Sequence, residues 1–181
     1  MQQSQKWNGF GRAPYTWDNL LTQELNNIPE MGLEGAVKHT ADTMLSFVDE
    51  NAVKDFAEKT IERLGITERN AEDAYRVLAE YWKVNNPTYD AYRNVVENTP
   101  RKVTFNAGHN CQFCVKPIMA LQNVEFYCNI RFKYNSLDNP VNVLLTKAVN
   151  PKLEWKLEYF RQDRQESCRY SIVLEEESAV N

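Results

Sequence analysis

Apolar positions in the first half of the chain recur every three or four residues, which is the spacing of one face of an α-helix. Proline, glycine and asparagine interrupt this spacing at intervals that fit helices of ordinary length. The first predicted helix starts at Thr16, a suitable N-cap, and stops at Pro29 and Gly32. Further helices are predicted at residues 33–48, 51–64, 67–84 and 87–96.

The second half of the chain changes to a period of two, which is typical of a β-strand with one buried face. The longest such run covers residues 124–134, with apolar side chains at every second position: Val124, Phe126, Cys128, Ile130, Phe132 and Tyr134. Shorter strands are predicted at residues 102–106, 153–159 and 168–174, the last two as an antiparallel hairpin. Residues 141–149 are mainly apolar and fit either a strand or a helix.

The order of these elements predicts the fold class. Helices come first and strands follow, which favours an α+β fold with helices packed on one face of an antiparallel sheet. Residues 1–15 read as an N-terminal arm. Residues 16–181 are predicted to form one domain, with a helical half at 16–99 and a sheet half at 100–176.

Composition and charge narrow the classes of partner. The 181 residues carry a formal charge of −4, and the lysines and arginines are scattered among acidic residues, so we expect no binding to nucleic acid. No apolar run approaches the roughly 18 residues that a membrane span needs, and no secretory signal is visible. We therefore expect a cytoplasmic protein whose partner is a small molecule, with the oligomeric state left open.

The four cysteines are the residues most able to carry chemistry. Four thiols are too sparse for a disulfide scaffold, although their even number also permits a secreted form with two bridges. Cys111 and Cys114 form a Cys-x-x-Cys pair beside a glycine-containing loop that holds His109. Cys128 and Cys168 lie on the apolar faces of their predicted strands, where a thiol commonly packs as a small hydrophobic group.

Three kinds of chemistry fit these thiols. A nucleophilic cysteine, Cys111 or Cys128, would need a nearby base such as His109 to form its thiolate. Alternatively, four ligands could hold a structural zinc ion. The candidate zinc ligands are Cys111, Cys114, Glu125, Cys128 and Cys168, with His109 as a further choice. A thioredoxin-type dithiol is disfavoured because that motif starts a helix within a βαβ unit, which this chain lacks.

The order of short motifs resembles the L-2-amino-thiazoline-4-carboxylic acid hydrolase-like family. The matching segments are Cys111-Gln112-Phe113, Cys128, Asn150-Pro151 and Cys168-Arg169-Tyr170, within residues 100–176. The resemblance implies a small-molecule enzyme that acts on a C–N bond of a small heterocycle or a related substrate, with cysteines near the site. Cys114 and the N-terminal arm fall outside this pattern.

A second resemblance is to vinyl-reductase-type small-molecule-binding domains, which carry a Glu-x-x-Cys zinc element. Glu125-Phe126-Tyr127-Cys128 matches that element, and Cys111 or Cys114 precedes it. This resemblance implies a non-enzymatic binding or sensor module with structural zinc.

The leading prediction is the hydrolase-like enzyme, with no cofactor and a pocket between the helices and the sheet. Cys111 or Cys128 is the predicted nucleophile and His109 its base. Asn129, Arg131 and Arg169 are predicted to orient a substrate carboxylate, because the arginine fork matches that group. The zinc-holding module is the alternative, and a third alternative is that all four thiols only fill the core.

Overall fold

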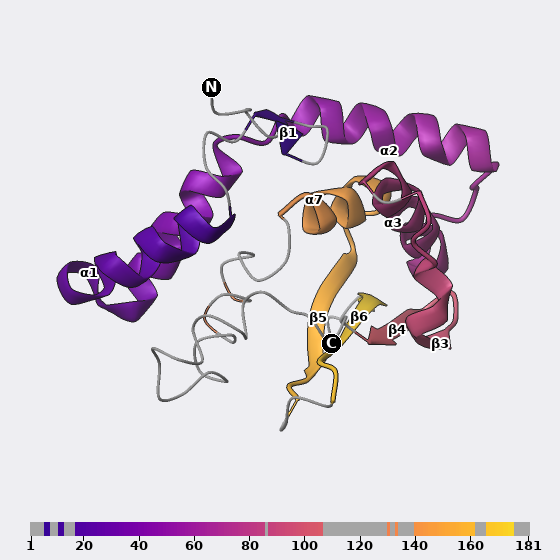
Figure 1. Ribbon diagram of the computed structural model, residues 1–181. Coiled ribbons are helices and arrows are strands. Elements are labelled where there is room, and N and C mark those ends of the chain that lie inside the picture. The colour runs from indigo at the N-terminus through magenta and orange to yellow at the C-terminus, as the bar shows by residue number, and fades with distance from the viewer. Residues whose placement is uncertain are drawn as a thin grey trace, which may run out of the picture. The chain divides into compact units, whose positions relative to one another are not determined.

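The computed structural model describes residues 6–7, 11–12, 17–85, 87–106, 130, 133, 140–161 and 166–175 (Figure 1). The chain divides into two compact units, which we call unit 1 and unit 2. Unit 1 comprises residues 1–52 and 110–141, and unit 2 comprises residues 53–109 and 142–181. The prediction of one domain over residues 16–181 stays a prediction.

Unit 1 contains a short hairpin and a long, broken helix. Within the predicted arm, β1 (Lys6–Trp7) pairs antiparallel with β2 (Gly11–Arg12). Helix α1 spans Trp17–Leu45 but leaves helical geometry at Gly32, where φ is 70° and ψ is 167°. The predicted break at Gly32 is therefore confirmed, whereas Pro29 lies inside the helix and does not end it.

The predicted strand at residues 124–134 is wrong at the two positions that the structure describes. Ile130 and Lys133 are both helical, and Lys133 Nζ forms an ion pair with Glu34 Oε1 at 2.6 Å. The same segment has apolar residues at Phe126, Ile130 and Tyr134, which is helical spacing, so alternation alone did not discriminate between the two periods. The other residues of this segment lie outside the described part of the chain.

Two helices, α2 and α3, lie mainly in unit 2, and their ends follow from local signals. Helix α2 (Glu50–Leu64) stops at Gly65, whose φ of +64° is the left-handed stop that the sequence predicts. Helix α3 (Ala71–Asn85) starts later than the predicted Thr67. Its cap is Asn70, because the Asp73 N–H donates to Asn70 Oδ1 at 3.1 Å and the Asn70 N–H donates to Asp73 Oδ2 at 3.3 Å.

The predicted helix at residues 87–96 is replaced by one turn and a strand. Asp90 caps the 3₁₀ turn η1 (Ala91–Asn94), and β3 (Val95–Asn98) follows at once. Two consecutive β-branched valines favour the strand, and β3 gains backbone partners by pairing with β4 (Lys102–Asn106).

The remaining elements complete an antiparallel sheet. Residues 141–149, left ambiguous by the sequence, belong to helix α7 (Pro140–Val149). The predicted hairpin is confirmed as β5 (Leu153–Tyr159) and β6 (Arg169–Leu174). The sheet order is β3-β4-β6-β5, and each neighbouring pair is antiparallel. The α+β fold class is confirmed.

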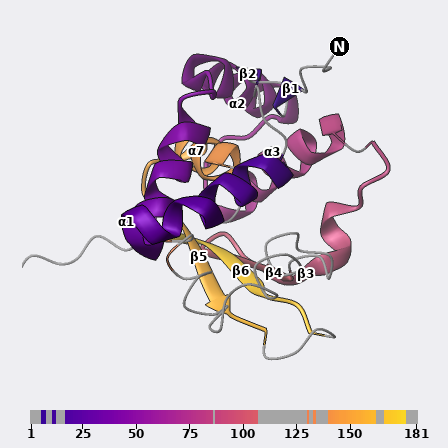
Figure 2. The same cartoon turned by 60° about the vertical axis from the view of Figure 1, so that its left-hand side comes forward.

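One face of the sheet is apolar and carries the core of unit 2. Helix α3 packs on β4 and β6, and Figure 2 shows α3 and α7 on the same side of the sheet. Trp82 Nε1 donates to Asn142 Oδ1 at 3.2 Å, which ties α3 to α7. The buried side chains that the sheet contributes to this face are Val103, Phe105, Leu153, Trp155, Tyr170 and Ile172.

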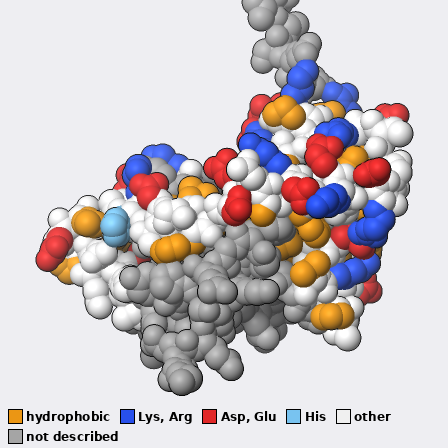
Figure 3. All heavy atoms as spheres, turned by 90° about the horizontal axis from the view of Figure 1, so that it is seen from above, with side chains coloured by type: hydrophobic (Ala, Val, Ile, Leu, Met, Phe, Trp, Pro, Cys, Tyr) orange, Lys and Arg blue, Asp and Glu red, His pale blue; other side chains and the backbone are white. Residues whose placement is uncertain are grey.

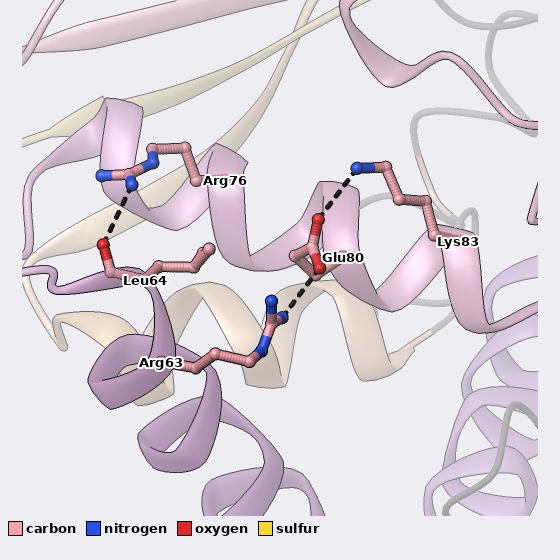
Figure 4. Close-up of polar contacts among 5 residues, drawn as sticks. All are labelled: Arg63, Leu64, Arg76, Glu80 and Lys83. Atoms are coloured by element: carbon pink, nitrogen blue, oxygen red, sulfur yellow. Dashed lines mark hydrogen bonds and ion pairs between the residues drawn. The ribbon is translucent and has the colours of Figure 1, made fainter.

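A charged network joins α2 to α3 (Figure 4). Glu80 accepts hydrogen bonds from Lys83 Nζ at 2.9 Å and from Arg63 Nη2 at 2.7 Å. The hydrogen bond from Lys83 has the largest effect on the pKa of Glu80, followed by the bond from Arg63, and both lower it. Partial burial raises this pKa but does not outweigh the two hydrogen bonds. Arg76 Nη2 donates to the Leu64 carbonyl at 3.2 Å, so it closes the end of α2.

Replacing Glu80 with glutamine is expected to lower the free energy of unfolding at pH 7 by about 0.5–1 kcal/mol. The pKa of Glu80 is lower in the folded than in the unfolded state, so the stabilisation that its charge provides is complete above the unfolded pKa of about 4.3. This stabilisation is lost as the pH falls through the folded pKa. Urea unfolding of the wild type and of Glu80→Gln should be measured between pH 3 and pH 7. The difference in the free energy of unfolding between the two proteins should become smaller as the pH falls. An equal deficit across that range would contradict the role of the charge.

Candidate functional site

Most of the predicted site residues lie outside the described part of the chain. They are His109, Cys111, Cys114, Glu125, Cys128, Asn129 and Arg131. The structure places Cys168 immediately before β6 and Arg169 as the first residue of β6. The thiol of Cys168 is buried, at 7% exposure, as predicted for a thiol that packs in the core.

The second face of the sheet is polar, and we call it the polar face. At its centre Ser171 is fully buried, and its hydroxyl donates to Glu158 Oε1 at 2.6 Å. Lys102 Nζ lies 3.1 Å from the same oxygen. The hydrogen bond from Ser171 is the largest cause that lowers the pKa of Glu158, and Lys102 lowers it further. Partial burial raises this pKa but does not outweigh them. Thr104 Oγ1 donates to Glu97 Oε2 at 3.2 Å. These charges and hydroxyls satisfy one another, so this part of the polar face is structural.

A bulge in β5 changes the direction of Tyr159. Leu157 pairs with Tyr170 and Tyr159 pairs with Arg169, so two steps along β5 match one step along β6. Strict alternation would place Tyr159 on the apolar face with Leu157. The extra residue in the bulge brings it instead to the polar face, beside the exposed Arg169.

Three neighbouring strands therefore contribute one row of side chains at the end of the sheet. Arg169 is paired with Asn106 of β4 on one side and with Tyr159 of β5 on the other. Arg169 Cζ lies 5.9 Å from the centre of the Tyr159 ring, and Arg169 Nε lies 3.5 Å from Asn106 Oδ1. We call Asn106, Tyr159 and Arg169 the sheet-end row.

The hydroxyl of Tyr159 is itself held. It donates to Glu166 Oε2 at 2.5 Å, across the turn between β5 and β6. This bond fixes the ring against which the guanidinium lies, and it draws the Glu166 carboxylate to the tyrosine.

Arg169 differs from three arginines that lie in α2, in α3 and in the loop between these helices. Arg63, Arg69 and Arg76 each lie within ion-pair distance of a carboxylate. In the described ranges of the chain, no such carboxylate faces Arg169, and its terminal nitrogens have no acceptor.

On the molecular face shown in Figure 3, acidic and basic side chains are interspersed and no large area has one sign.

The sequence identified Arg169 but not Asn106 or Tyr159. Asn106 could have been selected from the sequence, because it ends a predicted strand and lies three residues before the candidate base His109. Tyr159 carries none, since alternation with Leu157 assigns it to the apolar face.

No family model, no curated protein and no solved structure matches this chain. Within the described segments, no three histidine, cysteine, aspartate or glutamate side chains are grouped so that they could hold a metal ion. No described helix combines the length and the apolar character that crossing a bilayer requires.

Proposed function

We propose that the protein is a cysteine-dependent enzyme acting on a C–N bond of a small heterocycle or a related molecule, similar to the L-2-amino-thiazoline-4-carboxylic acid hydrolase-like family. The observation that best supports this is the register of β4 and β6. Asn106, the last residue of β4, pairs with the predicted substrate-binding Arg169. The chain leads from Asn106 to His109 in three residues and to Cys111 in five.

The chemistry follows from the residue types. A thiolate, at Cys111 or Cys128, attacks the electrophilic carbon of the C–N bond, and His109 takes the thiol proton. The same proton then goes to the leaving nitrogen as the C–N bond breaks. Water next attacks the carbon bound to sulfur, while His109 takes a proton from the water. The C–S bond then breaks, and this proton returns to the sulfur to regenerate the thiol. Arg169, with Asn129 and Arg131, orients the carboxylate of the substrate.

The first experiment is thiol counting with elemental analysis on the native full-length chain. A fast-reacting thiolate has a depressed pKa, so one cysteine should react with iodoacetamide far faster than the others near pH 7, and the protein should hold no zinc. Peptide mass spectrometry identifies that cysteine, and Cys111→Ser and Cys128→Ser test the assignment. Cys168→Ser is the matched control, because the buried Cys168 should react slowly and its loss should leave the fast reaction unchanged.

Two other results would overturn this proposal. About one equivalent of zinc with three or four protected cysteines would indicate the zinc-holding sensor module instead, and chelation should then unfold it. Four slow cysteines and no metal would indicate thiols that only fill the core.

A further inference from the structure

The geometry points to a binding subsite for a single carboxylate group at the sheet-end row. In this subsite the terminal nitrogens of Arg169 hold the anion, while Tyr159 and Asn106 are positioning residues that orient Arg169. The inference rests on the proposed function only for the role of the ligand as substrate. Binding of the anion can be measured without any turnover.

The first argument is how Arg169 uses its donors. Its Nε faces Asn106 at 3.5 Å, and its planar group lies over the Tyr159 ring at 5.9 Å. Neither contact uses the terminal nitrogens, which have no hydrogen-bond or ion-pair acceptor in the described part of the chain. A guanidinium held in this way presents two parallel N–H donors, which match the two oxygens of a carboxylate.

The second argument is that the row is held in place from both sides. Asn106 and Tyr159 are the register partners of Arg169 on the two neighbouring strands, and the bulge in β5 is what brings Tyr159 to this face. Bulges beside binding sites commonly re-aim a side chain in this way. An arginine already ordered by its neighbours loses less freedom when it binds an anion, which raises its affinity.

The third argument selects the charge of the ligand. Glu166 is bound to the hydroxyl of Tyr159 and adds a negative charge beside the row. That charge disfavours a doubly charged phosphate more than a singly charged carboxylate. The expected ligand is therefore a small monocarboxylate.

The test uses two probes that differ only in the carboxylate, thiazolidine-4-carboxylate and thiazolidine. The arginine Nε–H signals of the ¹⁵N-labelled full-length protein are followed by NMR at constant ionic strength, and Arg169→Lys assigns the signal of Arg169. Thiazolidine-4-carboxylate should shift this signal to saturation, and thiazolidine should not. Equal shifts with both probes, or an unsaturated shift, would overturn the subsite.

Variants separate binding from positioning, with ligand-observed NMR as the readout. Tyr159→Leu removes the stacked ring and should weaken carboxylate binding by about tenfold, whereas Tyr159→Phe keeps the ring and should weaken it less. Arg169→Lys should abolish saturable binding. Arg93→Lys, at an exposed arginine in η1, is the matched control and should bind as the wild type does.

Each outcome decides the inference. Unchanged binding in Arg169→Lys removes the subsite, and unchanged binding in Tyr159→Leu removes the positioning role. If Tyr159→Leu does not fold, Asn106→Ala, which removes the acceptor of Arg169 Nε, tests the positioning role in its place. Carboxylate binding at Arg169 without a fast-reacting cysteine would retain the subsite and reject the proposed enzyme.

Discussion

Replacing Phe105 with alanine is expected to lower the free energy of unfolding by about 3–5 kcal/mol. Phe105 is 7% exposed and lies at the centre of the aromatic core of unit 2. Its ring centre is 5.2–6.1 Å from those of four other aromatic side chains: Tyr75, Trp82, Trp155 and Tyr170. Alanine would remove the buried apolar surface, the edge-to-face contact with Trp155 and the three tilted ring contacts, and the loss of these contacts adds to the cost of the cavity.

Urea unfolding followed by circular dichroism measures this effect. Phe105→Leu is the matched control, because it keeps most of the volume and should cost less than half as much. A single domain has a total stability of about 5–15 kcal/mol, so the alanine variant should unfold at a much lower urea concentration. A loss below about 1 kcal/mol would mean that the aromatic cluster is not the main core of unit 2.

Replacing Gly32 with alanine is expected to cost about 1–3 kcal/mol. At φ 70° and ψ 167° the backbone of Gly32 is in a region that is almost restricted to glycine. A Cβ atom placed there would meet no other atom within 4 Å, so the cost is backbone strain and not a steric clash with neighbours. The break in α1 therefore depends on this one residue.

Thermal unfolding with circular dichroism distinguishes strain from a rearranged helix. Gly35→Ala is the control, since Gly35 is helical and a Cβ there would lie 3.2 Å from Met31 Cβ. Its change in stability should stay below about 1 kcal/mol, because better helix propensity offsets the tight contact. A stable Gly32→Ala protein with higher helical content would show that the break is not required.

Elements with their own local signals were predictable from the sequence. Gly65 marks the end of α2 because its left-handed backbone is cheap only for glycine. The β5–β6 hairpin follows from two alternating runs with a polar turn between them. Both signals lie within a few residues, so no knowledge of distant contacts is needed.

Elements that depend on distant partners were not predictable. The valines of residues 95–98 favour a strand only weakly, and these residues form β3 because they pair with β4. Tyr159 faces Arg169 because of a register shift between β5 and β6. This shift depends on how the two strands pair, so the alternation of apolar residues along β5 alone does not indicate it.

The candidate site divides in the same way. Arg169 was predicted because a guanidinium group matches a carboxylate. Its positioning by Asn106 and Tyr159 could be found only from the register of three strands in the structure. The predicted roles of Cys111, Cys128 and His109 stay predictions, since these residues lie outside the described ranges.

The two register shifts have a consequence for the stability of the protein in concentrated solution. One lies in β3 between Val95 and Glu97, and the other in β5 between Leu157 and Tyr159, and these are the two edge strands of the sheet. A chain that joins a sheet edge needs an even row of backbone donors and acceptors, and a bulge interrupts and twists that row. Both edges of this four-stranded sheet are thus poor templates for edge-to-edge aggregation.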